Sequence, residues 1–347
     1  MFNKLLGKFS KDLGIDLGTT STLVFTPDKG IVINEPSVVA VNMRTDEILA
    51  VGDEAKKMVG KTPGHIQVIK PLVDGVISDF EVTEKMLKYF IDKIHSESFT
   101  LIPRPRVVIG IPLDITEVEK KAVKDAAKSA GARQVFLIEE SMAAAIGARL
   151  PVAEATATMI VDIGGGTTEI AVISLGGVVT WKTLRMAGNT LDNSIIQYVR
   201  EEFNILIGEQ VAENIKIKIG SASGAKEPME MPLRGRDLIN GLPKEVIISD
   251  SQVREAMSKI IGQIIENIKI TLEITPPELV ADIYEHGIIL TGGGALLRGL
   301  DKEIARATKI PVRVADDPLT CVVRGTGILL ADMELLNKVI SPSSEEL

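Results

Sequence analysis

The sequence predicts an α/β protein made of two similar domains. Two segments, 13–25 and 160–173, share one pattern: an apolar run, an aspartate, a turn that contains glycine and hydroxyl residues, and a second apolar run. Their aspartates, Asp16 and Asp162, lie 146 positions apart, a period that is too long for a solenoid and indicates duplicated domains. A length of 347 residues is sufficient for two domains, each with its own core.

Each repeated segment is typical of two strands joined by a tight turn that can hold a phosphate. In the second segment the turn is Gly164, Gly165 and Gly166, which lets the backbone approach a bulky anion and lets successive N–H groups form a concave nest. A carboxylate beside a phosphate repels it unless a cation lies between them, so Asp16 and Asp162 predict Mg²⁺ held through water. For this segment alone, the alternative is a plain glycine-rich hairpin.

A third glycine-rich segment extends the duplication. Residues 286–300 contain an apolar strand, a turn with three glycines at 292–294, and the start of a helix. Residues 106–113 in the first half are also a strand that leads into a helix, at the equivalent place in the repeat. The duplication therefore covers more than the two hairpins.

The remaining elements of the first half follow from local patterns. Strands are predicted at 30–33, 37–42, 48–51 and 135–138, and helices at 53–60, 81–95, 116–130 and 141–150. Thr116 and Glu119 form a capping box for the third of these helices, and Gly131 ends it. Val118 lies among charged neighbours in the first turn and is expected to be exposed.

The second half is predicted in the same way. Helices are expected from 188 to 203, from 207 onward, at 251–274 and at 299–308, with a strand at 312–315 and one final helix from 320 to 339. Prolines at 276 and 277 end the longest helix. Residues 220–245 are rich in glycine, proline and charge and indicate a small subdomain of strands and loops.

The three glycine-rich segments resemble the two phosphate loops and the adenosine loop of the superfamily of actin, Hsp70 chaperones and sugar kinases. Within it the chain is most similar to the MreB family of bacterial actins, as four further stretches indicate: Asn34-Glu35-Pro36-Ser37, Ile138-Glu139-Glu140, 142–147 and Thr275-Pro276-Pro277-Glu278-Leu279. The resemblance covers nearly the whole chain. It implies an actin-like fold of two duplicated α/β domains (ribonuclease H-like) around a nucleotide cleft, each with a small subdomain.

The implied domain boundaries are as follows. The first domain comprises 1–152 plus 320–347, with a small subdomain at about 34–70. The second comprises 153–319, with a small subdomain at about 189–250.

The resemblance also implies ATP or ADP and Mg²⁺ as cofactors and assigns the residues that bind them. The nucleotide-binding residues are Asp16, Gly18, Thr19, Thr20, Ser21, Asp162, Gly164, Gly165, Gly166, Glu213, Lys216, Gly293, Gly294 and Ala295. Asp16 and Asp162 face the metal through water, Glu140 orients or deprotonates the water that attacks the γ-phosphate, and Thr167 helps to position that water.

Without the resemblance, several of these residues have ordinary structural interpretations. Glu140 could be a carboxylate stabilised at a helix N-terminus, and Glu213 with Lys216 could be a surface ion pair. Three departures from the usual MreB pattern also stand out: Thr20-Ser21 in place of Ala-Asn, Ser141 in place of Pro, and Asn189-Thr190 in place of an acidic pair. The first two of these put the rate of ATP hydrolysis in doubt.

Composition excludes several other classes of protein. A net charge of −8 and only 3% aromatic residues argue against a nucleic-acid-binding surface. The single cysteine, Cys321, excludes an internal disulfide framework and fits a reducing cytoplasm. The apolar runs fall short of the ~20 residues that a spanning helix needs, and the start of the chain has no signal-peptide pattern.

Two apolar segments predict attachment to a membrane surface. Residues 2–9 carry Phe2, Leu5, Leu6 and Phe9 at helical spacing beside lysines, which is typical of a basic amphipathic helix in an anionic interface; the alternative is a frayed terminus. A second segment carries three apolar residues, which by resemblance insert into lipid or else tuck against their own domain: Phe99, Leu101 and Ile102. The expected location is therefore peripheral, on the inner face of the cytoplasmic membrane of a bacterium.

Three functions fit this fold. In the first, the chain is a cytoskeletal homopolymer that hydrolyses ATP, organises cell-wall synthesis and maintains rod shape; by resemblance it forms paired protofilaments through the helix of Val118 and works with MreC and RodZ. In the second it is an Hsp70-like ATPase, which requires a peptide-binding domain. In the third it is a sugar-kinase-like phosphotransferase, which requires a substrate pocket with a base.

Overall fold

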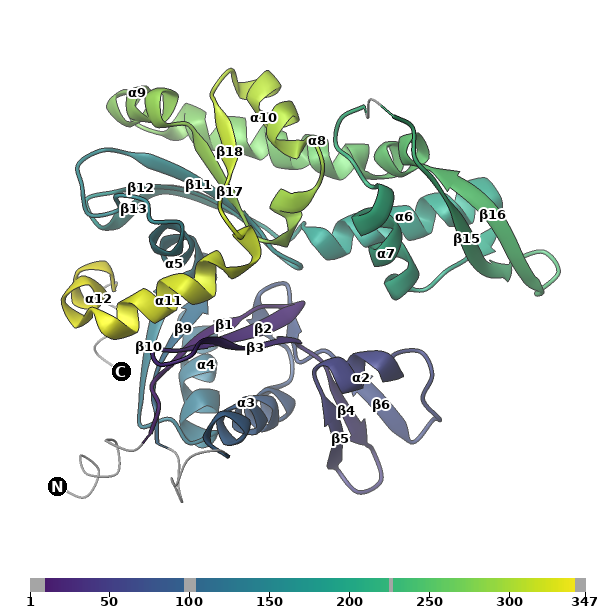
Figure 1. Cartoon of the computed structure of the whole chain (residues 1–347), viewed down its shortest axis with the longest axis horizontal. Coiled ribbons are helices and arrows are strands. Elements are labelled where there is room, and N and C mark those ends of the chain that lie inside the picture. Colours follow the sequence, from purple (N-terminus) through teal and green to yellow (C-terminus); the bar gives the residue numbers. More distant parts are fainter. Residues whose placement is uncertain (1–9, 97–103, 225–226, 341–347) are drawn as a thin grey trace. The chain divides into compact units, whose positions relative to one another are not determined.

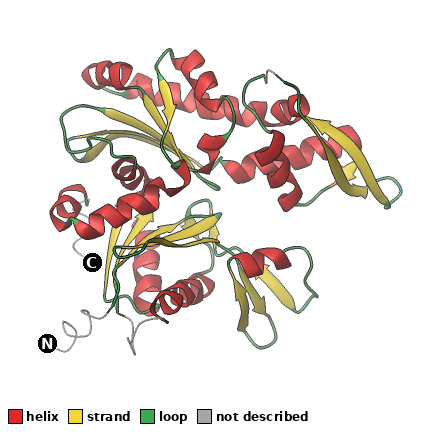
Figure 2. Cartoon of the chain, in the orientation of Figure 1, coloured by secondary structure: helices red, strands yellow, loops and turns green. Residues whose placement is uncertain are grey.

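The computed structural model describes residues 10–96, 104–224 and 227–340, coloured along the chain in Figure 1 and by secondary structure in Figure 2. The predicted membrane segments, residues 2–9 and Phe99, Leu101 and Ile102, lie outside the described residues. The chain divides into two compact units. Unit 1 comprises the described residues of Met1–Thr156, Ile173–Val179 and Leu319–Leu347, and unit 2 those of Ala157–Val172 and Thr180–Pro318.

Unit 1 is built on a five-stranded sheet. Its strand order is β10-β9-β1-β2-β3, with bounds Gln134–Glu139, Arg106–Ile111, Leu13–Leu17, Ser21–Thr26 and Gly30–Pro36. β1 pairs antiparallel with β2 and parallel with β9, and Ile15 lies opposite Ile109. Outside the small subdomain, the helices described in this unit are α3 (Phe80–His95), α4 (Glu117–Ser129), α5 (Glu140–Gly147), α11 (Cys321–Ala331) and α12 (Met333–Val339). The apolar side of α3, including Met86 and Phe90, packs into the same buried core as β1 and β9.

In unit 1, α5 and α11 pack at very close range, because a glycine of each helix faces the backbone of the other helix. A Cβ atom on Gly325 of α11 would overlap the carbonyl oxygen of Ala143 on α5, and one on Gly147 of α5 would overlap the carbonyl oxygen of Cys321. Close approach of this kind fixes the position of α5 against α11. It therefore fixes the position of Glu140, the first residue of α5.

A small subdomain follows β3 in unit 1. It contains the three-stranded sheet β5-β4-β6 (Glu47–Val51, Val39–Asn42 and Ile66–Ile69), helix α2 (Asp53–Met58) and a separate small core of Val38, Ala40 and Ala55. The two-stranded ribbon β7 (Leu72–Val73) and β8 (Val76–Ile77) comes next.

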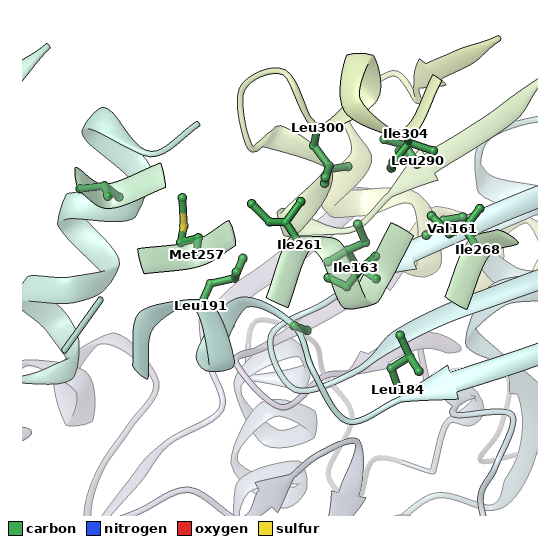
Figure 3. Close-up of a cluster of buried hydrophobic side chains, with 14 of the residues drawn as sticks. Val161, Ile163, Leu184, Leu191, Met257, Ile261, Ile268, Leu290, Leu300 and Ile304 are labelled. Atoms are coloured by element: carbon green, nitrogen blue, oxygen red, sulfur yellow. The ribbon is translucent and has the colours of Figure 1, made fainter. Parts of the chain in front are cut away.

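Unit 2 contains most of a second five-stranded sheet. The order is β13-β12-β11-β17-β18, with bounds Gly177–Leu184, Thr168–Ser174, Thr158–Ile163, Ile288–Thr291 and Val312–Val314; residues 173–179 are grouped with unit 1. Its helices are α6 (Gly188–Phe203), α7 (Glu209–Ile219), α8 (Asp250–Ile274), α9 (Pro277–His286) and α10 (Leu300–Thr308), with the short 3-10 helix η1 (Gly293–Leu296). Figure 3 shows part of the core, where Val161 and Leu290 of the sheet lie among residues such as Ile268 of α8 and Ile304 of α10.

The small sheet of unit 2 is β14-β15-β16, with bounds Ile205–Leu206, Glu230–Asp237 and Pro243–Ser249. Its buried apolar side chains belong to the main core of the unit: Ile205, Leu233 and Ile248. The predicted subdomain of strands and loops at 220–245 therefore contains one long hairpin, drawn beside α6 and α7 in Figure 1.

The two large sheets have the same strand order, which confirms the predicted duplication. In each, three consecutive strands (β1 to β3, or β11 to β13) lie beside two later ones (β9 and β10, or β17 and β18). The strand at 106–113 is thus the counterpart of the strand before the triple-glycine turn, as predicted.

Two local predictions need correction. The single helix expected from 320 to 339 is two helices, because the side chain of Asp332 accepts hydrogen bonds from the N–H groups of Glu334 and Leu335 and caps a new helix there. Helix α9 was not predicted; it begins directly after Pro276, since proline is tolerated in the first helical turn. Within the described residues, we find no helix with the length and apolar character that crossing a membrane requires.

Candidate functional site

Asp162 is a buried carboxylate with an unsatisfied oxygen. It is the second-to-last residue of β11, as Asp16 is of β1, and its residue exposure is only 6%. Its Oδ1 has no hydrogen-bond partner, and neither has Oγ1 of Thr291, which lies opposite it on β17. Burial raises the pKa of Asp162 to about 6, although the nearby Thr291 hydroxyl acts to lower it. A buried carboxylate oxygen without a partner fits a site for an ordered water or a hydrated cation.

The glycine turn after Asp162 has the backbone orientation that an anion needs. The N–H of Gly164 donates to the carbonyl of Thr167 (2.9 Å), which closes the turn. The carbonyls of Gly164 and Gly165 both face α6, because they accept the N–H groups of Gly188 (3.1 Å) and Asn189 (2.8 Å). The N–H of the next residue points the opposite way in a trans peptide, so the N–H groups of Gly165 and Gly166 both point away from α6.

Two successive N–H groups aimed in one direction make a nest for a phosphate. The nest and the unsatisfied carboxylate of Asp162 are separated by only two residues of chain. The turn can therefore bind an anion, and Asp162 can bind the cation that accompanies it.

Lys216 reaches the same turn from α7. Its Nζ donates to the carbonyl of Gly188 (2.8 Å) and to Oδ2 of Asp192 (2.9 Å), both on α6. Burial raises the pKa of Asp192 to about 6, and the charge of Lys216 and its hydrogen bond act to lower it. Asp192 was not among the predicted site residues. The sequence indicated only that a helix begins near Asp192. It could not indicate the ion pair, because Lys216 lies 24 residues further along the chain.

The triple-glycine segment packs on the backbone next to Asp162. A Cβ atom on Gly292 would overlap the carbonyl of Ile163, and one on Gly294 would overlap the Ile163 side chain. Ala295 is buried in η1 beside them. Unit 2 thus brings together the predicted phosphate turn, the predicted nucleoside loop and Lys216, with Glu213 one turn earlier on α7.

The corresponding turn of unit 1 is held by a serine that sequence reasoning missed. The Ser37 hydroxyl donates to the carbonyl of Gly18 (2.6 Å), and its backbone N–H donates to the carbonyl of Thr20 (3.0 Å). Oγ1 of Thr19 accepts the N–H of Gly75 (2.8 Å), which leaves its hydroxyl proton able to donate to a phosphate. In the sequence, Ser37 was noted only as part of the family-like stretch Asn34-Glu35-Pro36-Ser37, with no role in the turn. Ser21, a predicted nucleotide-binding residue, is the first residue of β2.

Glu140 lies over the strand next to β1. It is buried (8% exposed), and a Cβ atom on Gly110 of β9 would lie 3.3 Å from its Cγ and 4.0 Å from the carbonyl of Ile15, the neighbour of Asp16. Unit 1 therefore brings Glu140 to the strand pair that carries Asp16. Thr167, the other predicted catalytic residue, is buried in unit 2.

Among the described residues there is no cluster of three or more His, Cys, Asp or Glu side chains able to hold a metal. Mg²⁺ commonly keeps several waters and needs one or two carboxylates in addition to phosphate oxygens. Unit 2 supplies one such carboxylate in Asp162, and unit 1 supplies one in Asp16.

The duplicated sheet and its paired Asp-containing strands define an actin-like protein. The solved structure of MreB5 of Spiroplasma citri bound to ADP matches with a TM-score of 0.89 and 38% identity over 95% of this chain and 98% of that one. The MamK double helical filament matches with a TM-score of 0.78 and 25% identity, over 92% of this chain and 98% of the other.

Within that class, the family model described as MreB/Mbl protein matches residues 10–338. The cell shape-determining protein MreB of Escherichia coli (strain K12) is 51% identical over 339 residues, which is 96% of this chain and 97% of the relative. The chain belongs to the MreB/Mbl family. The resemblance expected from the glycine-rich segments is confirmed.

Proposed function

We propose that this chain is an ATP-dependent cytoskeletal protein that assembles into filaments on the cytoplasmic membrane and directs cell-wall synthesis in a rod-shaped bacterium. One observation carries the nucleotide part of the proposal: the N–H groups of Gly165 and Gly166 point one way beside a buried Asp162 with an unsatisfied Oδ1. An anion nest next to an unsatisfied carboxylate is suited to a phosphate with its metal ion. That MreB5 was solved with ADP supports the same ligand class.

In this proposal each unit supplies one phosphate-binding turn and one aspartate. Asp16 and Asp162 hold Mg²⁺ through water, and the metal neutralises charge on the phosphate oxygens. Gly293, Gly294 and Ala295 contact the nucleoside, and Glu213 lines the same region. Glu140 orients the attacking water with the help of Thr167, so that turnover depends on a carboxylate held rigidly at the start of α5.

Self-assembly follows from the family and from general symmetry arguments. A head-to-tail contact that does not close generates an open polymer, and the MamK relative was solved as a filament. Many weak membrane anchors on one polymer bind strongly together. Residues 2–9 and Phe99, Leu101 and Ile102 are the proposed anchors, and MreC and RodZ are the proposed membrane partners.

Electron microscopy of the purified protein with Mg-ATP tests the proposal. We expect filaments, and we expect them to lie on liposomes that contain anionic lipid but not on neutral ones. Filaments that form but ignore anionic lipid would refute the membrane part alone. No filaments under any nucleotide or lipid condition would favour an Hsp70-like or sugar-kinase-like ATPase.

Deleting the proposed N-terminal anchor tests its role, and the hydrogen bonds of Ser10 and Lys11 show where the deletion should end. The hydroxyl of Ser10 accepts the N–H of Arg104 (2.8 Å), and the N–H of Lys11 donates to Nε2 of His95 (3.1 Å), so both residues are part of the fold of unit 1. The deletion should therefore remove residues 2–9 and keep Ser10 and Lys11. We expect this variant to polymerise normally and to leave the liposome surface.

A further inference from the structure

We propose that Lys216 and Asp192 are positioning residues for the phosphate turn: they hold the first turn of α6, and α6 in turn sets the direction of the Gly165 and Gly166 N–H groups. This inference rests on the proposed nucleotide binding. It differs from the role that the resemblance assigned to Lys216, which was direct contact with the nucleotide. Asp192 had no assigned role.

The first structural link is between the phosphate turn and α6. The first N–H groups of a helix have no acceptor within the helix, and those of Gly188 and Asn189 bond to the carbonyls of Gly164 and Gly165. If the start of α6 shifts, these two carbonyls lose their donors and the two peptide planes can rotate. The N–H groups on the same peptide planes would then leave the nest orientation.

The second link is between α6 and α7. Lys216 bonds at once to the carbonyl of Gly188 and to the carboxylate of Asp192. The exposed fractions of the two side chains are 17% and 10%, so the ion pair is largely shielded from water. A buried charge that loses its partner is strongly destabilising, and this makes the pair a firm connection.

The third link is the space around Gly188. A Cβ atom there would lie 3.3 Å from the Gly164 carbonyl, 3.4 Å from Nζ of Lys216 and 3.6 Å from Cα of Gly165. Gly188 is therefore in contact with the turn on one side and with Lys216 on the other. Any displacement of the ammonium group is transmitted through one residue to the phosphate turn.

Replacing Asp192 with asparagine separates positioning from simple electrostatics. If charge alone mattered, removing a carboxylate near the phosphate turn would tighten binding of an anion. If Asp192 acts by holding Lys216 and α6, the Asp192→Asn variant binds Mg-ADP more weakly in spite of the lost negative charge. The two explanations therefore predict changes of opposite sign in the affinity of Asp192→Asn for Mg-ADP.

The experiment measures the dissociation constant of Mg-ADP by calorimetry for the wild-type full chain and for D192N, K216M and the K216M/D192N double variant. We expect weaker binding in D192N, a loss of at least about tenfold in K216M, where the carboxylate is left buried and unpaired, and partial recovery in the double variant. Asp250→Asn is the matched control, because Asp250 is also buried and ion-paired in unit 2 but bonds to Met229 and Arg254 instead. Circular dichroism checks that each variant is folded.

The outcomes are distinct. Unchanged or tighter binding in D192N overturns the proposal, and so do equal losses in K216M and the double variant, which would mean that Lys216 acts by direct contact with the nucleotide. If K216M does not fold, D192N and the double variant still decide between the explanations. Failure of the wild-type protein to bind Mg-ADP would instead refute the proposed function.

Discussion

Replacing Asp162 with asparagine is expected to stabilise the nucleotide-free protein at alkaline pH while it weakens the response to Mg-nucleotide. Asp162 is buried, its Oδ1 lacks a partner, and burial raises its pKa from 3.8 to about 6. In the folded chain at pH 8 the carboxylate is therefore charged at a cost that the unfolded chain does not bear. An amide of nearly the same shape carries no charge and removes this cost.

The magnitude follows from the pKa difference. The rise in the pKa of Asp162 from 3.8 to about 6 corresponds to about 3 kcal/mol in the free energy of unfolding. The pKa of Asp162 is higher in the folded chain than in the unfolded chain. The stability of the folded chain is therefore not reduced by this group below pH 3.8, where it is protonated in both states, and it falls as the pH rises through 6. The advantage of Asp162→Asn is thus about 3 kcal/mol at pH 8 and about half of that at pH 5.

Urea denaturation without nucleotide at the two pH values measures this difference, with a probe in unit 2 because the two units need not unfold together. Trp181, the only tryptophan, lies in the part of β13 that belongs to unit 2 and supplies that probe. The same titration with saturating Mg-ADP should show a smaller gain in stability for the variant than for the wild type. A variant that is destabilised equally at pH 5 and pH 8 would refute the reasoning, since the carboxylate would then contribute through packing and not through its buried charge.

Three other predictions concern packing, catalysis and assembly. Gly325→Ala should destabilise unit 1 by about 1–3 kcal/mol or more in urea denaturation, because its Cβ would overlap the carbonyl of Ala143; Gly262→Ala, in the exposed interior of α8 with nothing within 4 Å, should instead stabilise by about 0.5–1 kcal/mol. Glu140→Ala should slow phosphate release strongly with ATP affinity retained, and unchanged turnover would remove Glu140 from the mechanism. Val118→Glu should give single protofilaments in micrographs where the wild type gives pairs, because Val118 is 79% exposed on α4; pairs in the variant would exclude this helix from the contact.

Local chemistry made much of the fold predictable from the sequence. The expected capping box is present, since Oγ1 of Thr116 accepts the N–H of Glu119 and the Glu119 carboxylate accepts the N–H of Thr116. The helix predicted at 251–274 is α8, because eight apolar residues between Val253 and Ile268 keep one helical face and prolines follow the last turn. Such signals involve residues within one or two turns of each other, so one sequence is sufficient to read them.

The supports of the candidate site were not predictable for the opposite reason. Ser37 donates to the carbonyl of Gly18, 19 residues earlier in the chain. Lys216 donates to the carboxylate of Asp192, 24 residues earlier. Neither spacing is a recognised motif, and each side chain alone is an ordinary surface residue type. The break at Asp332 was missed because an aspartate in a helical pattern is usually a solvent-facing position, and only the cap geometry shows that it starts a new helix.

The departures from the usual family pattern can now be weighed by what the backbone does at each position. Asn189 stands where an acidic residue is usual, but its contribution to the phosphate turn is a backbone N–H, which any residue except proline supplies. Ser141 stands where proline is usual, in the first turn of α5, and there it preserves the helix start; the position of Glu140 follows from the close packing of α5 on α11 and does not depend on a proline ring. At Asn189 and Ser141 the fold uses main-chain atoms or helix packing, so we expect these changes to be tolerated. Asp162 and the Lys216–Asp192 pair present side-chain charges, so we expect substitutions there to alter nucleotide binding.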